Sequence, residues 1–157
     1  MTLKLKEILY CFVLVFITAQ ISQYLVHTGL FSFYDFLDKP SLTPQPSYFT
    51  YAWNLIYVLL FLGFYIALVS EQSPSQYSDL NALFIMQLFL QILWCFSFFY
   101  LYQLWASVAV IILLDMVVAL LLHSLFYINR WSFFLILPYF MWLLFATFLN
   151  IYILFLN

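Results

Sequence analysis

The sequence predicts an all-α integral membrane protein: a bundle of five transmembrane helices with a long first loop acting as a lid. Of its 157 residues, 68% are hydrophobic and only 6% are charged, whereas soluble domains carry roughly 25% charged residues. A soluble chain of this length could not bury so much apolar surface, while a lipid bilayer solvates it. At about 20 residues for each span plus short connections, five spans fit into a single transmembrane domain, residues 1–157.

The first predicted helix covers residues 5–26 and follows the basic Lys4 and Lys6. Its strictly apolar core, residues 8–19, is short enough to be the core of a signal peptide. The apolar stretch continues to Val26, however, and no convincing small-residue cleavage site follows it. We therefore expect a retained membrane anchor, with a signal peptide as the alternative.

A segment of different composition, residues 27–47, follows this helix. It contains three charged residues and three of the five prolines: Asp35, Asp38, Lys39, Pro40, Pro44 and Pro46. Long loops without regular structure are unusual in compact proteins unless they are functional, and prolines stiffen the chain around them. The segment also carries apolar side chains that a solvated spacer would lack: Phe31, Phe33, Tyr34, Phe36 and Leu37. We expect it to pack on the helix ends as a lid.

Four further helices are predicted from apolar stretches at residues 48–70, 79–100, 104–127 and 131–155. A polar turn that contains Pro74 separates the first two of these. The break near Tyr102 has neither glycine nor proline, and it is predicted because the apolar run from residue 80 to residue 126 is too long for one span. Pro138 lies inside the last helix, where it should kink or loosen the backbone.

The composition excludes several classes of function. Four basic residues cannot form the phosphate-neutralising surface that nucleic-acid binding requires. Two glycines leave no glycine-rich loop for a nucleotide phosphate. No group of residues has metal-ligand spacing, so we expect no metal site. Cys11 and Cys95 lie in apolar stretches and are predicted to be buried thiols.

Polar side chains inside the spans need a partner or a function, because lipid does not solvate them. Gln87 and Gln91 lie four residues apart on one face of the third helix, and Trp94 and Phe98 continue this face. The pattern predicts a stripe that faces the bundle interior, where the amides either bond between helices or line a ligand site. Asp115, the acid deep in a predicted span, should be protonated or paired with a polar neighbour.

Three groups of residues match the spacing of one known family. The first joins the loop to the second helix: Lys39-Pro40-Ser41, Thr43-Pro44, Trp53 and Tyr57. The second lies in the third helix: Ala82-Leu83, Gln87, Leu90, Trp94 and Phe98-Phe99. The third lies in the fifth helix: Pro138-Tyr139, Trp142, Phe145-Ala146-Thr147 and Leu149-Asn150. By these motifs the chain resembles the TspO/translocator protein family, also called tryptophan-rich sensory proteins or peripheral benzodiazepine receptors.

The resemblance implies a pocket beneath the first loop. Members of the family bind tetrapyrroles such as protoporphyrin IX and, in some cases, sterols or benzodiazepine-type molecules. By resemblance, the ligand-binding residues are Tyr34, Trp53, Tyr57, Gln91, Trp94, Ala109, Trp142 and Ala146. The candidate ligand is protoporphyrin IX or a haem-like tetrapyrrole, which would stack on the Trp and Tyr faces. No cofactor is required, a homodimer is an option, and the expected location is the bacterial cell membrane.

Some positions depart from the family pattern. Leu42 and Ile151 occupy sites where the family usually has tryptophan. The cholesterol-recognition pattern is incomplete, because no Lys or Arg follows Tyr152 before Asn157. Some bacterial members degrade porphyrin oxidatively with pocket tryptophans, and the two replacements weigh against this activity here. If it exists, Trp53 is the candidate catalytic residue.

Three functions follow as hypotheses. The preferred one is a TspO-like membrane protein that binds a porphyrin or similar flat apolar ligand for sensing, regulation or transport. The second is an enzyme that degrades porphyrin oxidatively. The third is a regulatory or assembly partner in the membrane whose pocket is vestigial.

Overall fold

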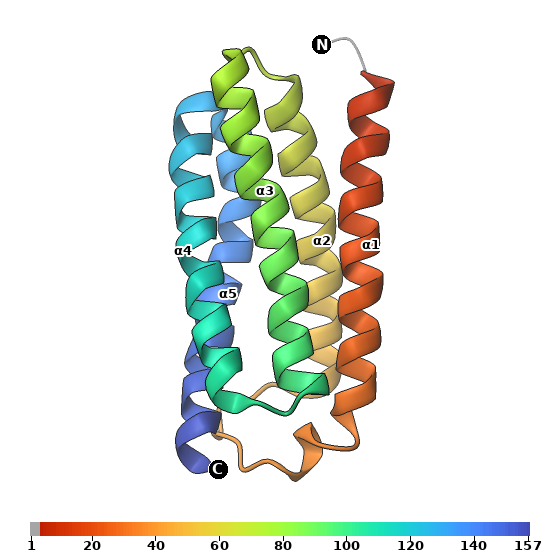
Figure 1. The fold of residues 1–157 in the computed structure, drawn as a ribbon, viewed down its shortest axis with the longest axis vertical. Coiled ribbons are helices and arrows are strands. Elements are labelled where there is room, and N and C mark those ends of the chain that lie inside the picture. Colours follow the sequence, from red (N-terminus) through yellow and green to blue (C-terminus); the bar gives the residue numbers. More distant parts are fainter. Residues whose placement is uncertain (1–3) are drawn as a thin grey trace.

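The computed structural model describes residues 4–157, and this part of the chain is helical, without a β-strand (Figure 1). It contains five long helices: α1 (Leu5–Leu30), α2 (Pro46–Val69), α3 (Pro74–Cys95), α4 (Leu104–Ile128) and α5 (Arg130–Leu156). Two short elements complete it, the 3-10 helix η1 (Tyr34–Phe36) and the π-helix η2 (Phe96–Tyr100). Five helices, with η2 continuing α3, are long and apolar enough to cross a membrane. The predicted five-span fold is confirmed.

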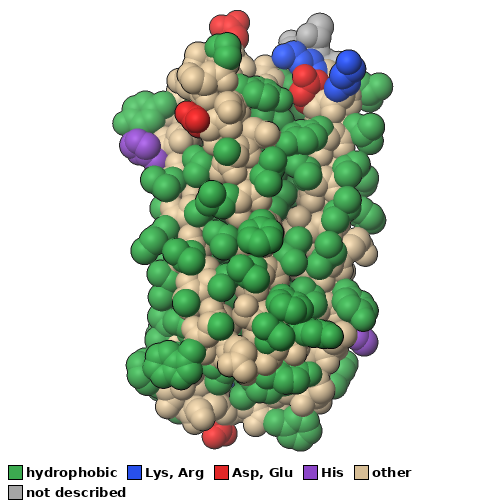
Figure 2. Space-filling model, viewed as in Figure 1, with side chains coloured by type: hydrophobic (Ala, Val, Ile, Leu, Met, Phe, Trp, Pro, Cys, Tyr) green, Lys and Arg blue, Asp and Glu red, His purple; other side chains and the backbone are tan. Residues whose placement is uncertain are grey.

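The five helices form a ring in which each helix packs on two neighbours, in the order α1, α2, α5, α4 and α3. Successive helices run in opposite directions, so the chain starts at one end of the bundle and finishes at the other, beside the lid (Figure 1). Hydrophobic side chains cover the flank, and charged side chains gather towards the two ends (Figure 2). This distribution fits a bilayer around the middle of the bundle, and the protein is an integral membrane protein.

Two helices begin at prolines and therefore start earlier than predicted. α2 begins at Pro46 rather than residue 48, and α3 begins at Pro74 rather than residue 79. Proline suits the first turn of a helix, because its φ is already helical and its missing N–H is not needed there. Ser73 completes the start of α3 with a capping box, since its Oγ accepts from the Gln76 backbone and the Gln76 side chain accepts from the Ser73 N–H.

The third span ends in a π-turn that the sequence pattern did not predict. The Leu101 N–H donates to the carbonyl of Phe96, five residues earlier, at 2.9 Å. The wider turn brings the consecutive Phe98 and Phe99 to the bundle interior, where both are buried. Tyr102 then adopts a left-handed φ of 58°, which ends the helix without glycine or proline. The predicted break near residue 102 is thus confirmed.

The lid is shorter than the predicted loop of residues 27–47. It covers residues 31–45, because α1 continues to Leu30 and α2 begins at Pro46. It crosses the end of the bundle from α1 to α2 (Figure 1). Tyr34 packs against Phe98 and Phe99, with ring centroids 6.1 and 6.0 Å apart. The expectation that this segment covers the helix ends is confirmed.

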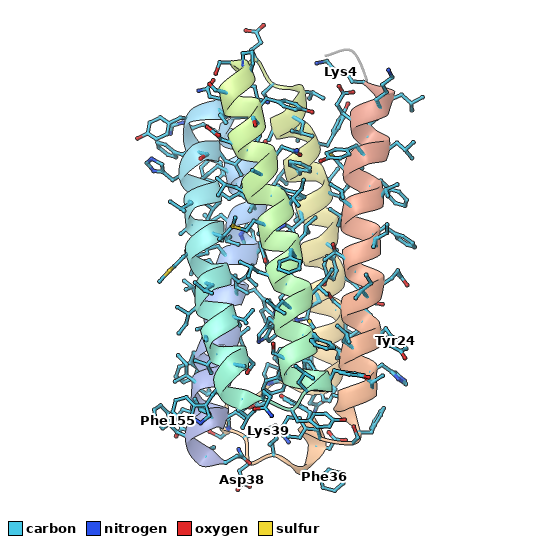
Figure 3. All side chains as sticks on the ribbon, viewed as in Figure 1. Lys4, Tyr24, Phe36, Asp38, Lys39 and Phe155 are labelled. Carbon is cyan, nitrogen blue, oxygen red and sulfur yellow. The ribbon has the colours of Figure 1, made fainter. Side chains whose placement is uncertain are left out.

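Lys39 and Asn157 hold the lid in shape. The Lys39 ammonium donates to the carbonyls of Tyr34 and Leu37 at 2.7 and 2.9 Å. The Asn157 side chain pairs with the backbone of Asp38, accepting from its N–H at 2.9 Å and donating to its carbonyl at 3.0 Å. Asp38 and Lys39 lie at the lid end of the bundle, where the exposed Phe36 also lies (Figure 3). Asn157, the C-cap residue of α5, therefore binds the middle of the lid.

Candidate ligand pocket

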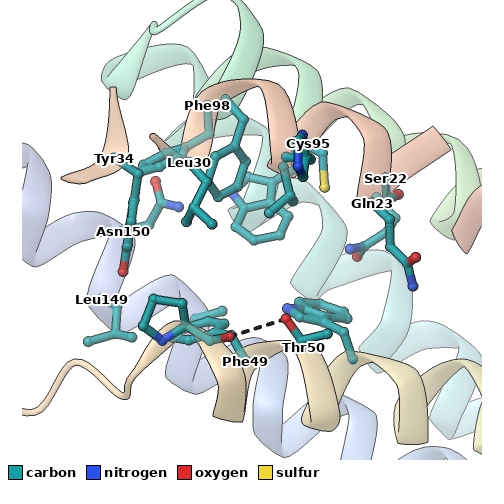
Figure 4. A pocket seen from close by; sticks show the side chains of 18 of the residues that line it. Ser22, Gln23, Leu30, Tyr34, Phe49, Thr50, Cys95, Phe98, Leu149 and Asn150 are labelled. Atoms are coloured by element: carbon teal, nitrogen blue, oxygen red, sulfur yellow. Dashed lines mark hydrogen bonds between the residues drawn. The ribbon is translucent and has the colours of Figure 1, made fainter. Parts of the chain in front are cut away.

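A cavity of about 290 Å³ lies inside the ring at the lid end. Residues of α1, the lid, α2, α3, η2 and α5 line it (Figure 4). Its lining is mostly apolar, which is typical of pockets for small organic ligands. No Asp, Glu, Lys or Arg belongs to the lining within residues 4–157.

Aromatic rings from four elements form the wall of this cavity. Trp53 and Tyr57 lie one helical turn apart on α2, with ring centroids 6.1 Å apart. Trp94 of α3 faces Trp53 at 5.9 Å and contacts Phe99 of η2 at 6.4 Å. Tyr34 adds its ring from the lid. The arrangement offers flat apolar faces on which an aromatic ligand can stack.

Neutral amide groups supply polar contacts deep in the bundle. The Tyr139 hydroxyl lies 3.0 Å from Gln87 Oε1, to which it donates, and 3.4 Å from Gln91 Oε1. Both glutamines are buried, so the predicted inward stripe on the third span is confirmed. Gln91 also lines the cavity, whereas Gln87 does not. The indole Nε1 of Trp94 is fully buried and has no hydrogen-bond partner among the described residues.

Asn150 provides a further polar group on the α5 side. Its Oδ1 accepts a hydrogen bond from Ser107 Oγ of α4 at 2.8 Å, which fixes the orientation of the amide. Its Nδ2 donates no hydrogen bond within the part of the protein that the structure describes. Figure 4 shows the Asn150 side chain at the cavity wall near Tyr34. The pocket thus offers uncharged donors and no fixed cation.

Tyr34 keeps its hydroxyl proton across the physiological pH range. Burial of the side chain is the main cause that raises its pKa to about 12, and the neighbouring charge of Asp35 also raises it. The Lys39 ammonium lies 4.8 Å from the centroid of the Tyr34 ring. Tyr34 therefore presents a neutral hydroxyl and an aromatic face to the cavity.

The structure brings six of the eight predicted site residues together at the cavity: Tyr34, Trp53, Tyr57, Gln91, Trp94 and Ala146. It does not bring the other two there. Ala109 is exposed on α4, which lines no part of the cavity and supports it only through Ser107. Trp142 packs behind Phe49, with ring centroids 5.3 Å apart, and Phe49 lines the cavity in its place.

The sequence analysis missed the contribution of α1 to the lining, besides Phe49 and Thr50 of α2 and Leu149, Asn150 and Ile153 of α5. Ser22, Gln23, Val26 and His27 line the cavity, although the first helix was interpreted only as an anchor. Polar residues inside an apolar span were the available signal. Cys95 also lines the cavity, and both it and Cys11 are free and buried, as predicted.

Asp115 lies outside the cavity. Its Oδ2 accepts a hydrogen bond from the Thr147 hydroxyl at 2.8 Å, so the predicted pairing with a polar neighbour is confirmed. Among the described residues, no group of His, Cys, Asp or Glu side chains could hold a metal ion. The chemistry of the pocket therefore rests on aromatic rings and neutral hydrogen-bonding groups.

Comparisons with known proteins identify one family over most of the chain. The sequence profile of the TspO/MBR family matches residues 8–156. The tryptophan-rich protein TspO of Archaeoglobus fulgidus is 37% identical over 126 residues, which is 80% of each chain. The protein of the same name from Chlorobaculum tepidum is 28% identical over 125 residues, covering 80% of this chain and 79% of its own. The chain belongs to the TspO/MBR family.

Proposed function

We propose that this protein binds a porphyrin or a similarly flat, largely apolar ligand in the pocket beneath its lid. The observation that carries the proposal is the aromatic wall of Trp53, Tyr57, Trp94, Phe99 and Tyr34 around a cavity with an apolar lining. Stacking on such faces contributes about 0.5–1.5 kcal/mol for each well-placed ring pair. Binding of this kind would serve sensing, regulation or transport.

The polar groups support a ligand that accepts hydrogen bonds near its edge. Gln91 and Asn150 place amides at the wall, and the Nδ2 of the buried Asn150 donates no hydrogen bond within residues 4–157. A buried donor without a partner costs free energy, which a ligand acceptor would recover. Because no Asp, Glu, Lys or Arg of residues 4–157 lines the cavity, the ligand part that enters should be neutral.

The test is quenching of tryptophan fluorescence by protoporphyrin IX in purified protein. We expect saturable, one-site quenching, and Trp94→Phe should weaken the affinity about two- to tenfold, because the smaller ring offers less stacking area to the ligand. Trp131→Phe is the matched control, since Trp131 is 76% exposed at the other end of the bundle. It should leave the affinity unchanged.

Quenching that follows only the partitioning of porphyrin into detergent, with no change in Trp94→Phe, would contradict the proposal. That result would favour a membrane regulatory or assembly partner whose pocket is vestigial.

A further inference from the structure

The exposed residues of the cavity lining all belong to α1 and α2. Every lining residue from α3, η2 and α5 is buried. In contrast, Gln23 and His27 of α1 and Pro46 and Thr50 of α2 line the cavity and are also exposed at the surface. Figure 4 shows Gln23 and Thr50 on opposite sides of this space. The cavity therefore reaches the surface between α1 and α2, through what we call the side opening, defined by these four residues.

The side opening faces the flank of the bundle rather than its end. Gln23 lies seven residues before Leu30, the end of α1, which is about 10 Å along a helix at 1.5 Å per residue. Tyr24, Tyr48 and Tyr51 project outward beside it, with exposed fractions of 68, 63 and 73%. Tyrosine concentrates where headgroups meet hydrocarbon. The side opening thus lies at the depth where acyl chains begin.

One hydrogen bond spans the seam between α1 and α2 at this level. Gln23 Nε2 donates to Asn54 Oδ1 at 2.8 Å, and no other side-chain hydrogen bond joins these two helices within residues 4–157. Both amides are on the exposed surface, where lipid offers neither of them a partner. The pair therefore favours a closed seam, and its rupture would let the helices separate beside the cavity.

We propose that ligands reach the pocket from the bilayer through the side opening, and that the Gln23–Asn54 hydrogen bond is the latch that controls this passage. This inference rests on the proposed function, and it narrows the ligand class to a molecule that dissolves in the membrane. Such a ligand has a flat apolar body, which passes between Leu30 and Trp53 into the cavity. Its polar end stays beside His27 and Thr50 at the rim.

The experiment measures the rates of protoporphyrin IX binding to full-length protein in lipid nanodiscs by stopped-flow fluorescence. Gln23→Met and Asn54→Leu keep the side-chain size and remove the latch. We expect association and dissociation to accelerate together by about three- to tenfold in both variants, as loss of one hydrogen bond in a membrane would allow. In Asn54→Leu, which changes no residue of the cavity lining, the equilibrium constant should change less than twofold. The double variant should be no faster than either single variant, because both remove one bond.

Tyr10→Phe is the matched control. It removes another exposed hydrogen bond of α1, from the Tyr10 hydroxyl to Asn81 Oδ1 at 2.8 Å, far from the cavity, and should leave both rates unchanged. Asn157→Ala loosens the lid instead. Unchanged rates in Gln23→Met, or a greater acceleration by Asn157→Ala, would overturn the proposal in favour of access beneath the lid.

A second measurement separates this inference from the proposed function. In bilayers of brominated phosphatidylcholine, an open seam exposes Trp53 to quenching by the acyl chains without any added ligand. Gln23→Met should increase the quenching, and the increase should vanish when Trp53→Phe is added. If Gln23→Met increases the quenching but the protein binds no porphyrin, only the proposed ligand is rejected. If Gln23→Met does not increase the quenching, the side opening is rejected.

Discussion

Tyr34 connects the lid to the pocket through a single side chain. Its ring packs on Phe98 and Phe99 of η2, and the Lys39 ammonium lies against the ring at 4.8 Å. Cation–π contacts contribute about 0.5–2 kcal/mol, depending on how far they are desolvated. The same lysine bonds the Tyr34 carbonyl, so the ring and the backbone of this residue are held by one partner.

Burial of the Tyr34 hydroxyl has a consequence at high pH. Its pKa in the folded protein is raised to about 12, whereas an unfolded tyrosine ionises near pH 10. Below about pH 10 both states are neutral, and the residue adds no pH dependence. As pH rises from about 10 to about 12, the unfolded state loses protons first, so the folded lid loses stability.

Titration of tyrosinate absorbance checks this prediction. Tyr34→Phe should reduce the amplitude of the ionisation that is expected at about pH 12 and leave the earlier ionisations in place. A reduction confined to the earlier ionisations would show that the hydroxyl is solvated in the folded protein.

At the scale of helices, α1 approaches η2 so closely that only glycine fits between them. A Cβ on Gly29 would lie 2.7 Å from the Cα of Phe99 and would also meet its carbonyl. Backbone atoms cannot rotate away, so the two elements would have to separate. Gly63 of α2 differs, because a Cβ there would meet the side chain of Ile136 at 2.7 Å, and a side chain can adjust.

These two glycines provide a matched test of helix packing. Gly29→Ala should lower the free energy of unfolding by about 1–3 kcal/mol, the usual cost of overpacking. Gly63→Ala should cost less, because adjustment of Ile136 and a helix-propensity gain of about 1 kcal/mol offset the clash. Thermal unfolding followed by circular dichroism measures both. If both variants lose the same free energy of unfolding, the backbone contact between α1 and η2 adjusts as easily as the side chain of Ile136.

The sequence predicts the spans well and their ends less well. Hydropathy places all five helices, because a span must be apolar along its whole length. The starts of α2 and α3 were placed late, although Pro46 and Pro74 are recognisable as first-turn residues. The π-turn of η2 has no signal of its own, since it depends on how α3 meets α1 and α4.

The pocket was predicted only in part, for reasons of packing. Spacing on one helix was enough to place Gln91 and Trp94 at the wall, and Trp53 with Tyr57. Whether Ala109 and Trp142 reach the cavity depends on how α4 and α5 are rotated about their axes. In the structure Phe49 of α2 lines the cavity, and Trp142 packs against Phe49 without lining it. The face of α1 that meets the cavity likewise depends on the order of the helices around the ring. The periodicity of the sequence carries no information about this order.

At the scale of the whole molecule, the lid is fastened to the chain at points far apart in sequence. Asn157 pairs with Asp38, 119 residues away, and its side chain also donates to the carbonyl of Ile153 in the last turn of α5 at 2.9 Å. The bonds to the lid are exposed to water, so each contributes only about 0.5–1.5 kcal/mol. Their joint effect is to define where the middle of the lid lies over the bundle.

Removal of this fastening should loosen the lid without unfolding the bundle. Asn157→Ala should speed amide hydrogen exchange in residues 31–45 by about three- to tenfold, as loss of roughly 1 kcal/mol of local stability would produce. Exchange in the core of α4 should stay unchanged. Asn157→Asp, which retains the acceptor for the Asp38 N–H but loses both donors, should have a smaller effect. Uniform acceleration across all helices would instead indicate a global loss of stability.

The position of the side opening has a consequence for how the protein samples its surroundings. The opening lies near the lid end of the bundle, and the seam between α1 and α2 further from the lid is closed by packed side chains. Molecules dissolved in the opposite leaflet would have to flip across the membrane before they could reach it. A change in the composition of the lid-side leaflet alone would therefore alter pocket occupancy, and the protein would report on one half of the bilayer.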